Sequence, residues 1–149
     1  MIDKKRVGAG FGVIVLDGNK VLMGLRNDDA VKADSDLRGE GTWCIPGGKL
    51  NYGETFEQGG IRETKEETDI DVHDIEVYCV QNDMNEHAHY MTIGMVAKKW
   101  SGTPKVTEPD EIVAWKWFDL DDLPKNIFFP SRKCIEKYCE GVFYKKGGA

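Results

Sequence analysis

The sequence predicts a fold that mixes strands and helices, either α/β or α+β, and three observations support this prediction. Two strand-like runs form an opening hairpin over residues 7–26. A strongly capped helix is expected at 55–68 and a second helix near the C-terminus. Between them lie three further strand-like runs. Because 149 residues suffice for one hydrophobic core, we expect a single domain that spans 1–149.

The opening hairpin is predicted from the apolar runs Val7 to Leu16 and Lys20 to Arg26, which flank the turn signal Asp17-Gly18-Asn19. Residues 27–42 are polar, acidic and glycine-containing, so a long loop is expected there. A short apolar strand, Trp43 to Ile45, should follow and end at Pro46-Gly47-Gly48.

The central helix is predicted to begin at a capping box, in which the Thr55 hydroxyl and the Gln58 amide satisfy amide groups at the helix start. Its density of Glu, Lys and Arg favours a helix to about Thr68. Gly59 and Gly60 each cost roughly 1 kcal/mol relative to alanine. Close packing or a close backbone approach should compensate there.

The second half of the chain is predicted to contain strands at 74–81, 89–98 and 112–118, with a connecting loop at 105–111. Asp121 to Pro124 suggests a short helical turn. Residues 131–139 have the composition of a final helix, whose N-cap should lie at Pro130-Ser131 or nearby.

Composition excludes two classes of partner. The net charge of −6 argues against a nucleic-acid binder, because such binding relies on clustered Lys and Arg. No membrane association is expected, since no stretch approaches the roughly 20 apolar residues that cross a bilayer. The charged start, Met1 to Arg6, lacks the features of a signal peptide, so a cytosolic protein is expected.

The cysteines, Cys44, Cys79, Cys134 and Cys139, include no C-x-x-C pair, which argues against a zinc knuckle or a thioredoxin-like site. We expect free, mostly buried thiols. If the substrate of this acidic protein is a phosphate anion, a cation must mediate its binding.

The predicted central helix carries three carboxylates on one face, because Glu63, Glu66 and Glu67 stand at i, i+3 and i+4. Each like-charge pair costs a few tenths of a kcal/mol in an isolated helix. Ligation by carboxylates alone favours a hard ion such as Mg²⁺. The glutamates by themselves are better explained by a solvated acidic face.

The residues around these glutamates change that balance. The pattern G-x5-E-x7-R-E-U-x-E-E-x-G-U, where U is bulky and apolar, is matched by Gly48, Glu54, Arg62, Glu63, Glu66, Glu67 and Ile70. The segment therefore resembles the Nudix box. Thr64 stands where an apolar residue is usual and Asp69 where glycine is usual. Neither departure removes a proposed ligand, and Asp can adopt the left-handed conformation that ends a helix.

The resemblance implies a fold, a metal and a set of roles. The fold would be an α/β/α sandwich with a mixed, partly curled sheet. The metal would be Mg²⁺, with Mn²⁺ as a substitute, and its ligands would be the Gly47 carbonyl, Glu63, Glu66, Glu67 and a late carboxylate from Glu108 or Glu111. Arg62 would orient the carboxylates with Glu54 as its partner. We assign the general base to Glu63, although Nudix enzymes differ in where this base lies.

The resemblance extends to the MutT-type subfamily that includes plant cytosolic Nudix enzymes. It covers nearly the whole chain and is strongest at 23–26, 43–48, 108–117 and 123–130. Those relatives hydrolyse nucleoside triphosphates, including oxidised or unwanted ones, to the monophosphate and pyrophosphate. Substrate contacts would fall to Arg26 at the phosphates, Phe129 stacked on the base, and Gly48, Lys49 and His89. Phe129 takes a place where those relatives often have Trp.

Other functions stay open within the same resemblance. The substrate could instead be a nucleotide sugar, ADP-ribose or an isoprenoid diphosphate, or the chain could be a nucleotide-binding module without catalysis. A proline that often follows the box in ADP-ribose hydrolases is absent around 84–87, which counts against that substrate. The intact Glu63, Glu66 and Glu67 count against a loss of catalysis. A homodimer is suggested by analogy alone.

Two weaker patterns are expected to be structural. His87 and His89 would share one face of a strand but have no third soft ligand nearby, so an edge or pocket-lining position is favoured over a metal site. Trp115 and Trp117 alternate on a predicted strand and should face the core.

Overall fold

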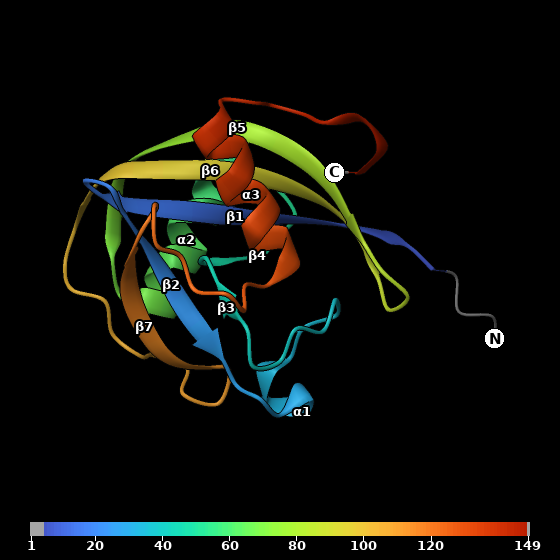
Figure 1. Ribbon diagram of the computed structural model, residues 1–149, viewed down its shortest axis with the longest axis horizontal. Coiled ribbons are helices and arrows are strands. Elements are labelled where there is room, and N and C mark those ends of the chain that lie inside the picture. The colour runs from blue at the N-terminus through green and yellow to red at the C-terminus, as the bar shows by residue number, and fades with distance from the viewer. Residues whose placement is uncertain (1–4, 149) are drawn as a thin grey trace.

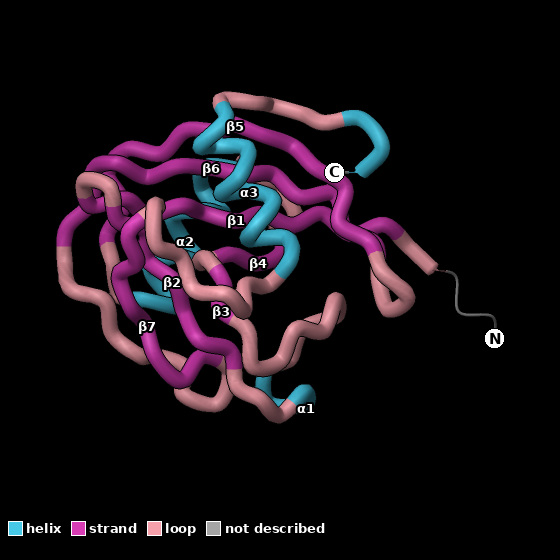
Figure 2. The backbone as a smooth tube through the Cα atoms, viewed as in Figure 1, coloured by secondary structure: helices cyan, strands magenta, loops and turns pink. Residues whose placement is uncertain are grey.

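A computed structural model describes residues 5–148 and shows one mixed sheet with helices on both of its faces (Figures 1 and 2). Residues 1–4, which carry part of the N-terminal prediction, lie outside the described residues. The strands are β1 (Val7–Asp17), β2 (Lys20–Arg26), β3 (Trp43–Cys44), β4 (Gly47–Lys49), β5 (Asp71–Met84), β6 (His89–Ser101) and β7 (Ile112–Asp119). The helices are α1 (Ala30–Ala33), α2 (Phe56–Thr68), α3 (Phe129–Glu140) and the short 3₁₀ turn η1 (Lys146–Gly148).

The sheet is mixed because one of its pairings is parallel. Its main path runs β3-β2-β1-β6-β5, with β4 paired to β1 and β7 paired to β2. β1 and β6 run parallel from Val7–His89 to Val15–Ala97, and the other pairings between strands are antiparallel. In Figure 1 β1, β5 and β6 cross the view, whereas β2 and β7 descend at an angle to them. The sheet is therefore bent but not closed.

The two faces of β1 point into two separate cores. Phe11, Val13 and Val15 pack with Ile70 and Met95 on the α2 side. Alternation along the strand sends Ile14 and Leu16 to the other side, where they meet Cys134 and Ile135 of α3. A central strand that is buried on both faces needs a continuous apolar run, which is what the sequence has there. The predicted α/β/α sandwich is confirmed.

Helix α2 matches its prediction closely. Thr55 accepts from Gln58 N, and the Gln58 side chain accepts from Thr55 N, which completes the capping box. The helix ends at Asp69 in the left-handed conformation, with φ of 66°. A Cβ on Gly60 would lie 2.8 Å from the Ile75 side chain and 2.9 Å from the Met95 side chain. The glycines therefore allow α2 to lie directly on the sheet, as expected.

The structure corrects several local predictions. The loop 27–42 contains the single-turn helix α1, because Asp29 caps the amides of Val31 and Lys32. Gly47 and Gly48, predicted with Pro46 to end a strand, instead pair with β1 as part of β4. A plain turn replaces the expected helical turn at 121–124.

Two further predictions fail at the ends of elements. α3 begins two residues earlier than predicted, with Phe128 at the N-cap and no side-chain cap, because the Ser131 hydroxyl accepts from Ile45 N instead. His87 lies in the turn before β6 and does not share a strand with His89. The predictions for cysteine and tryptophan hold. The cysteines are free, and three of the four are buried. Trp115 and Trp117 are partly buried against the core.

Candidate active site

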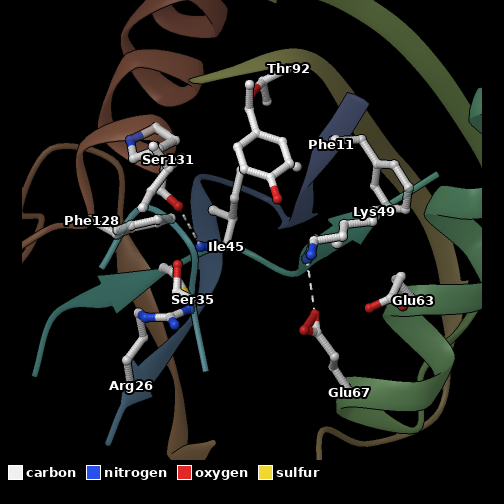
Figure 3. Close-up of a pocket in the computed structure, with 18 of the residues that line it drawn as sticks. Phe11, Arg26, Ser35, Ile45, Lys49, Glu63, Glu67, Thr92, Phe128 and Ser131 are labelled. Atoms are coloured by element: carbon white, nitrogen blue, oxygen red, sulfur yellow. Dashed lines mark hydrogen bonds between the residues drawn. The ribbon is translucent and has the colours of Figure 1, made fainter. Parts of the chain in front are cut away.

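A cavity of about 430 Å³ opens between α2, β4 and the start of β6 on one side and the loop 27–42 and the start of α3 on the other. Figure 3 shows Glu63 and Glu67 on one wall, with Phe128, Ser131 and Arg26 on the opposite wall. Most of the predicted site residues that line this cavity are on its acidic side: Gly47, Gly48, Lys49, Glu63, Glu67 and Glu111. Arg26 reaches it from the opposite wall.

Arg62 on α2 contacts the carboxylates of Glu54, Glu63 and Glu66. Its Nε lies 2.6 Å from Glu54 Oε2 and its Nη2 lies 2.9 Å from Glu54 Oε1, so the pair is bidentate. Its Nη1 donates to Glu63 at 2.6 Å and to Glu66 at 3.3 Å. Arg62 lowers the pKa of Glu54 to about 2. The Glu54 carboxylate thus holds the guanidinium in place, and the guanidinium in turn holds Glu63.

Glu67 lies among other acids and, within residues 5–148, has one hydrogen bond, from the Gly47 amide at 2.9 Å. Burial raises the pKa of Glu67 well above its usual value, and the charges of Glu63, Glu108 and Glu111 raise it further. The pKa of Glu111 is raised by burial and by Glu108 in the same way. These acidic groups from α2 and from the loop before β7 therefore repel one another.

The loop before β7 is attached to the end of α2, which explains how late residues reach the site. Lys105 N donates to Thr68 O, and the Thr107 hydroxyl donates to Glu66 O. Glu111 then lies at the cavity, whereas Glu108 and Glu66 are exposed and do not line it.

The glycines of β4 make room for the acidic wall. A Cβ on Gly48 would lie 2.6 Å from the carboxylate carbon of Glu63, and one on Gly47 would lie 2.2 Å from Phe11 O. No residue larger than glycine fits at either position without a shift of backbone or carboxylate. The position of β4 between β1 and α2 therefore requires glycine at both 47 and 48.

The donor set of the acidic wall suits a divalent cation. Its side-chain donors are carboxylate oxygens, the ligands that Mg²⁺ prefers, and a bound cation would relieve the repulsion at Glu67. Within residues 5–148, no three His, Cys, Asp or Glu side chains are arranged as a ready metal site. The ion pairs of Arg62 give a reason, because they draw Glu63 and Glu66 toward its guanidinium.

A family comparison supports the likeness that the sequence suggested. The NUDIX domain model matches residues 6–138. The chain belongs to the Nudix hydrolase family.

Individual Nudix proteins resemble the chain over most of its length. The NAD-capped RNA hydrolase NudC of Stutzerimonas stutzeri is 28% identical over 123 residues, which are 83% of this chain and 42% of that protein. The crystal structure of a MutT NUDIX hydrolase from Burkholderia pseudomallei has a TM-score of 0.78 at 28% identity and covers 89% of this chain and 98% of its own. The NUDIX domain of Shewanella oneidensis NrtR, solved with ADP ribose, has a TM-score of 0.69 at 22% identity and covers 92% of this chain and 89% of its own.

The chain spans less than half the length of the NudC relative that it matches. No helix within the described residues is long and apolar enough to cross a bilayer.

Two residues predicted to contact substrate in this Nudix domain do not line the cavity. His89 points to the sheet face opposite that of Tyr90, because side chains alternate along β6, and its Nε2 lies 3.5 Å from Asn82 Oδ1. Phe129 starts α3, while its neighbour Phe128 takes the place at the cavity wall with Arg26 5.0 Å from its ring centroid.

Sequence reasoning also missed residues that line the cavity. Asp36 in the loop 27–42 pairs with Lys49 at 2.9 Å and accepts from the Tyr90 hydroxyl. Thr92 and Ser131 line the inner end of the cavity, away from the glutamates. The alternation of Tyr90 and Thr92 with Met91 and Ile93 is a signal that could have placed the first two on one face. No sequence signal points to Asp36.

Proposed function

We propose that the chain is a magnesium-dependent diphosphohydrolase that converts a nucleoside triphosphate to the monophosphate and pyrophosphate. The observation that carries the proposal is the acidic wall, where Glu63, Glu67 and Glu111 face a cavity without enough positive charge to balance them. Such uncompensated charge in a cleft is typical of a site that is completed by a ligand. Lys49 and Arg26, which also line the cavity, are suited to phosphate oxygens.

In this proposal Glu63, Glu67 and Glu111 hold the metal, with Glu66, Glu108 and the Gly47 carbonyl as further candidates. When bound, Mg²⁺ would offset phosphate charge and lower the pKa of a water. Lys49 and Arg26 bind the phosphates.

Glu63 is the group that takes the proton from the attacking water. Its side chain is 20% exposed, and burial raises its pKa, which favours a proton acceptor over a permanently ionised carboxylate. Arg62 holds Glu63 in position, and the bidentate pair with Glu54 fixes Arg62. Water adds to the α- or the β-phosphorus, the bond from that phosphorus to the oxygen that bridges the two breaks, and the monophosphate and pyrophosphate separate.

The test is to measure pyrophosphate and phosphate release from a panel of nucleoside triphosphates, with Mg²⁺ and with EDTA. We expect pyrophosphate and monophosphate from at least one triphosphate, and none with EDTA. Mn²⁺ should restore turnover. Phosphate without pyrophosphate, or turnover that is unchanged by EDTA, would contradict the proposal.

A second candidate is a dinucleotide or nucleotide sugar, in which the diphosphate joins two groups. NudC, named an NAD-capped RNA hydrolase, favours it, as does the ADP ribose held by the NrtR domain. NAD, ADP-ribose, a nucleotide sugar and an isoprenoid diphosphate therefore belong in the same panel. Release of two monophosphates from NAD, with no turnover of triphosphates, would replace the first candidate.

Location and assembly are part of the proposal. The four cysteines are free, which fits the reducing cytosol. A homodimer is expected from the family likeness, and light scattering would test it.

A further inference from the structure

We propose that Cys79 and Cys134 form a modification site, in which hydrogen peroxide that enters the cavity converts the two thiols to a disulfide. Cys79 comes from β5 and Cys134 from α3, and Cys134 also lines the cavity. Both are buried and free. The inference does not depend on the proposed reaction, because neither cysteine belongs to the acidic wall.

A bulge in β5 turns two consecutive side chains toward α3. The register of β5 against β6 shifts between Val77 and Cys79, which leaves Tyr78 as the extra residue. Cys79 is fully buried, and the Tyr78 ring packs in the same apolar cluster as Cys134. The Tyr78 hydroxyl also donates to Cys134 O at 2.7 Å. This turn of α3 is therefore fixed against the bulge.

Two glycines make the space in which the thiols meet. Gly12 of β1 and Gly94 of β6 are direct partners in the parallel pair of strands. A Cβ on Gly94 would overlap Cys79 Sγ, and one on Gly12 would lie 3.8 Å from Cys134 Sγ. The two sulfurs thus lie over neighbouring positions of the sheet, where the thiols are hydrogen-bonded to each other. No backbone segment separates them.

The surroundings of the two thiols give them different roles. The hydrogen bond with Cys134 lowers the pKa of Cys79, and the Tyr78 hydroxyl and the positive charge of Lys137 lower it further. The hydrogen bond with Cys79 and burial raise the pKa of Cys134 well above its usual value. Cys79 is therefore the better thiolate, and the thiolate is the form that attacks a peroxide. Cys134 is the neighbouring thiol that can complete a disulfide.

The reaction takes two steps and consumes one hydrogen peroxide. Cys79 loses its proton and attacks one peroxide oxygen, so that a sulfur–oxygen bond forms, the oxygen–oxygen bond breaks and one water leaves. Cys134 then attacks the sulfur of the resulting sulfenic acid, the sulfur–oxygen bond breaks, and its thiol proton leaves with the hydroxyl group as a second water. The two thiols supply the two electrons that reduce the peroxide.

A disulfide changes the cavity wall at α3. The sulfurs of a disulfide are about 2 Å apart, closer than those of two hydrogen-bonded thiols. The new bond therefore draws Cys134 toward β5. Ser131, one turn earlier in α3, also lines the cavity and accepts from the Ile45 amide at 3.0 Å. The shift is thus transmitted to the part of the wall that opposes the glutamates.

The test treats the full chain with hydrogen peroxide and then alkylates it under denaturing conditions without a reductant. Peptide mass spectrometry should find Cys79 joined to Cys134 with the loss of two hydrogen atoms, and dithiothreitol should reverse the cross-link. A Cys139→Ser protein should give the same result, since Cys139 is exposed and takes no part. Separate alkylation of Cys79 and Cys134 after treatment would overturn the inference.

Cys79→Ala is the informative variant, because it removes the proposed nucleophile and leaves Cys134 in the cavity wall. Cys134 should then be recovered as the alkylated thiol. The matched control is Cys44→Ala, since Cys44 is also a buried cysteine that lines the cavity but lies beside Arg26. This control should form the cross-link as the wild-type protein does. Failure of the control to do so would mean that the wrong pair has been assigned.

The size of the peroxide tests the route of entry. Hydrogen peroxide is little larger than water, whereas tert-butyl hydroperoxide must pass the cavity wall with a bulky group. We expect the cross-link to form more slowly with tert-butyl hydroperoxide. Equal rates would mean that opening of the fold exposes the sulfurs, and entry through the cavity would be wrong.

Activity separates this inference from the proposed function. If a triphosphate is cleaved, the cross-linked protein should lose kcat/KM by about tenfold, because a displacement of about 1 Å in a site is enough to do so. Dithiothreitol should restore it, and Cys79→Ala should keep its activity through the treatment. An unchanged kcat/KM in the cross-linked protein would overturn the shift of the wall. If no triphosphate is cleaved but the cross-link forms, the proposed reaction fails and the modification site stands.

Discussion

Two clusters of ionisable side chains flank the sheet, and they differ in how their charges are matched. Between α3 and β5, the buried carboxylate of Asp83 pairs with Lys133 at 2.9 Å and accepts from Gln81 at 2.8 Å. Lys137, also buried, donates to the other end of the Gln81 amide at 3.2 Å. Each group in this first cluster has a partner within the protein.

The second cluster consists of the acidic side chains on α2 and in the loop before β7. Its charges are not matched by partners in this way. Arg62 is the cation that contacts its carboxylates, and Glu54 already holds that guanidinium. Glu67 has the Gly47 amide and otherwise faces acids. Charges that are matched internally can be buried without a large cost in stability, whereas unmatched charges at a cleft cost stability and are retained for a ligand.

Glu67→Gln tests the difference between the two clusters most directly. We expect kcat to fall about 10³-fold, because the acidic wall loses a ligand charge. The free energy of unfolding should not fall without metal, since the neutral amide can still accept from the Gly47 amide and the repulsion from Glu63 and Glu111 is gone. Pyrophosphate release and urea denaturation measure the two effects.

Glu57→Gln is the matched control, because Glu57 is an exposed glutamate in the first turn of the same helix. It should leave kcat unchanged and lower the free energy of unfolding by less than about 1 kcal/mol, because an acid in the first turn of a helix contributes no more than that. A Glu67→Gln protein with wild-type turnover would remove the acidic wall from the site.

Asp83→Ala should have the opposite signature. It leaves the largely buried Lys133 ammonium without its counter-charge and removes one of the two acceptors of the Gln81 amide, and the loss of one member of a buried ion pair typically costs about 3 kcal/mol. Thermal or urea unfolding should show this loss, whereas kcat well below Tm should stay within about twofold of the wild-type value, because Asp83 does not line the cavity. Glu76→Ala, on the exposed side of the same strand, should change stability by less than about 0.5 kcal/mol. A stable but inactive Asp83→Ala protein would mean that the first cluster serves the reaction.

Magnesium should stabilise the folded protein through the second cluster alone. At ten times its Kd, a ligand that binds only the folded state adds about 1.4 kcal/mol. We expect Mg²⁺ to raise Tm in the wild-type and Asp83→Ala proteins and to have no effect on Glu67→Gln. An equal rise in all three would show that the ion acts elsewhere.

The contrast also explains which parts of the site could be predicted from the sequence. Glu63, Glu66 and Glu67 are close in sequence, so helix periodicity alone places them on one face. The capping box and the left-handed Asp69 were predictable for the same reason, since each depends on residues a few positions apart. The hairpin β1–β2 is equally local.

The remaining parts depend on contacts that no local pattern encodes. Phe128 rather than Phe129 lines the cavity because α3 starts without a side-chain cap, while Ser131 bonds to Ile45, 86 residues away in sequence. Asp36 reaches Lys49 and Tyr90 because the loop 27–42 folds across the cavity mouth, where the Asn85 side chain holds Leu37 O at 2.8 Å. The pairing of β4 with β1 was not predicted because Gly47 and Gly48 indicate a turn in the sequence. In the structure these glycines also leave the space that lets β4 lie against its neighbours.

The smallest expected effect concerns this loop. The Lys49–Asp36 pair is exposed, so Asp36→Asn should change stability by less than about 1 kcal/mol. Its effect should appear in KM, because Asp36 competes with substrate phosphate for the Lys49 ammonium. We expect KM to fall a few-fold with kcat unchanged, and the fall to shrink at high salt, where exposed charges are screened. Glu40→Gln is the matched control, since the Glu40–Arg38 pair is exposed in the same loop but does not line the cavity. A rise in KM for Asp36→Asn would instead mean that the carboxylate itself contacts the substrate.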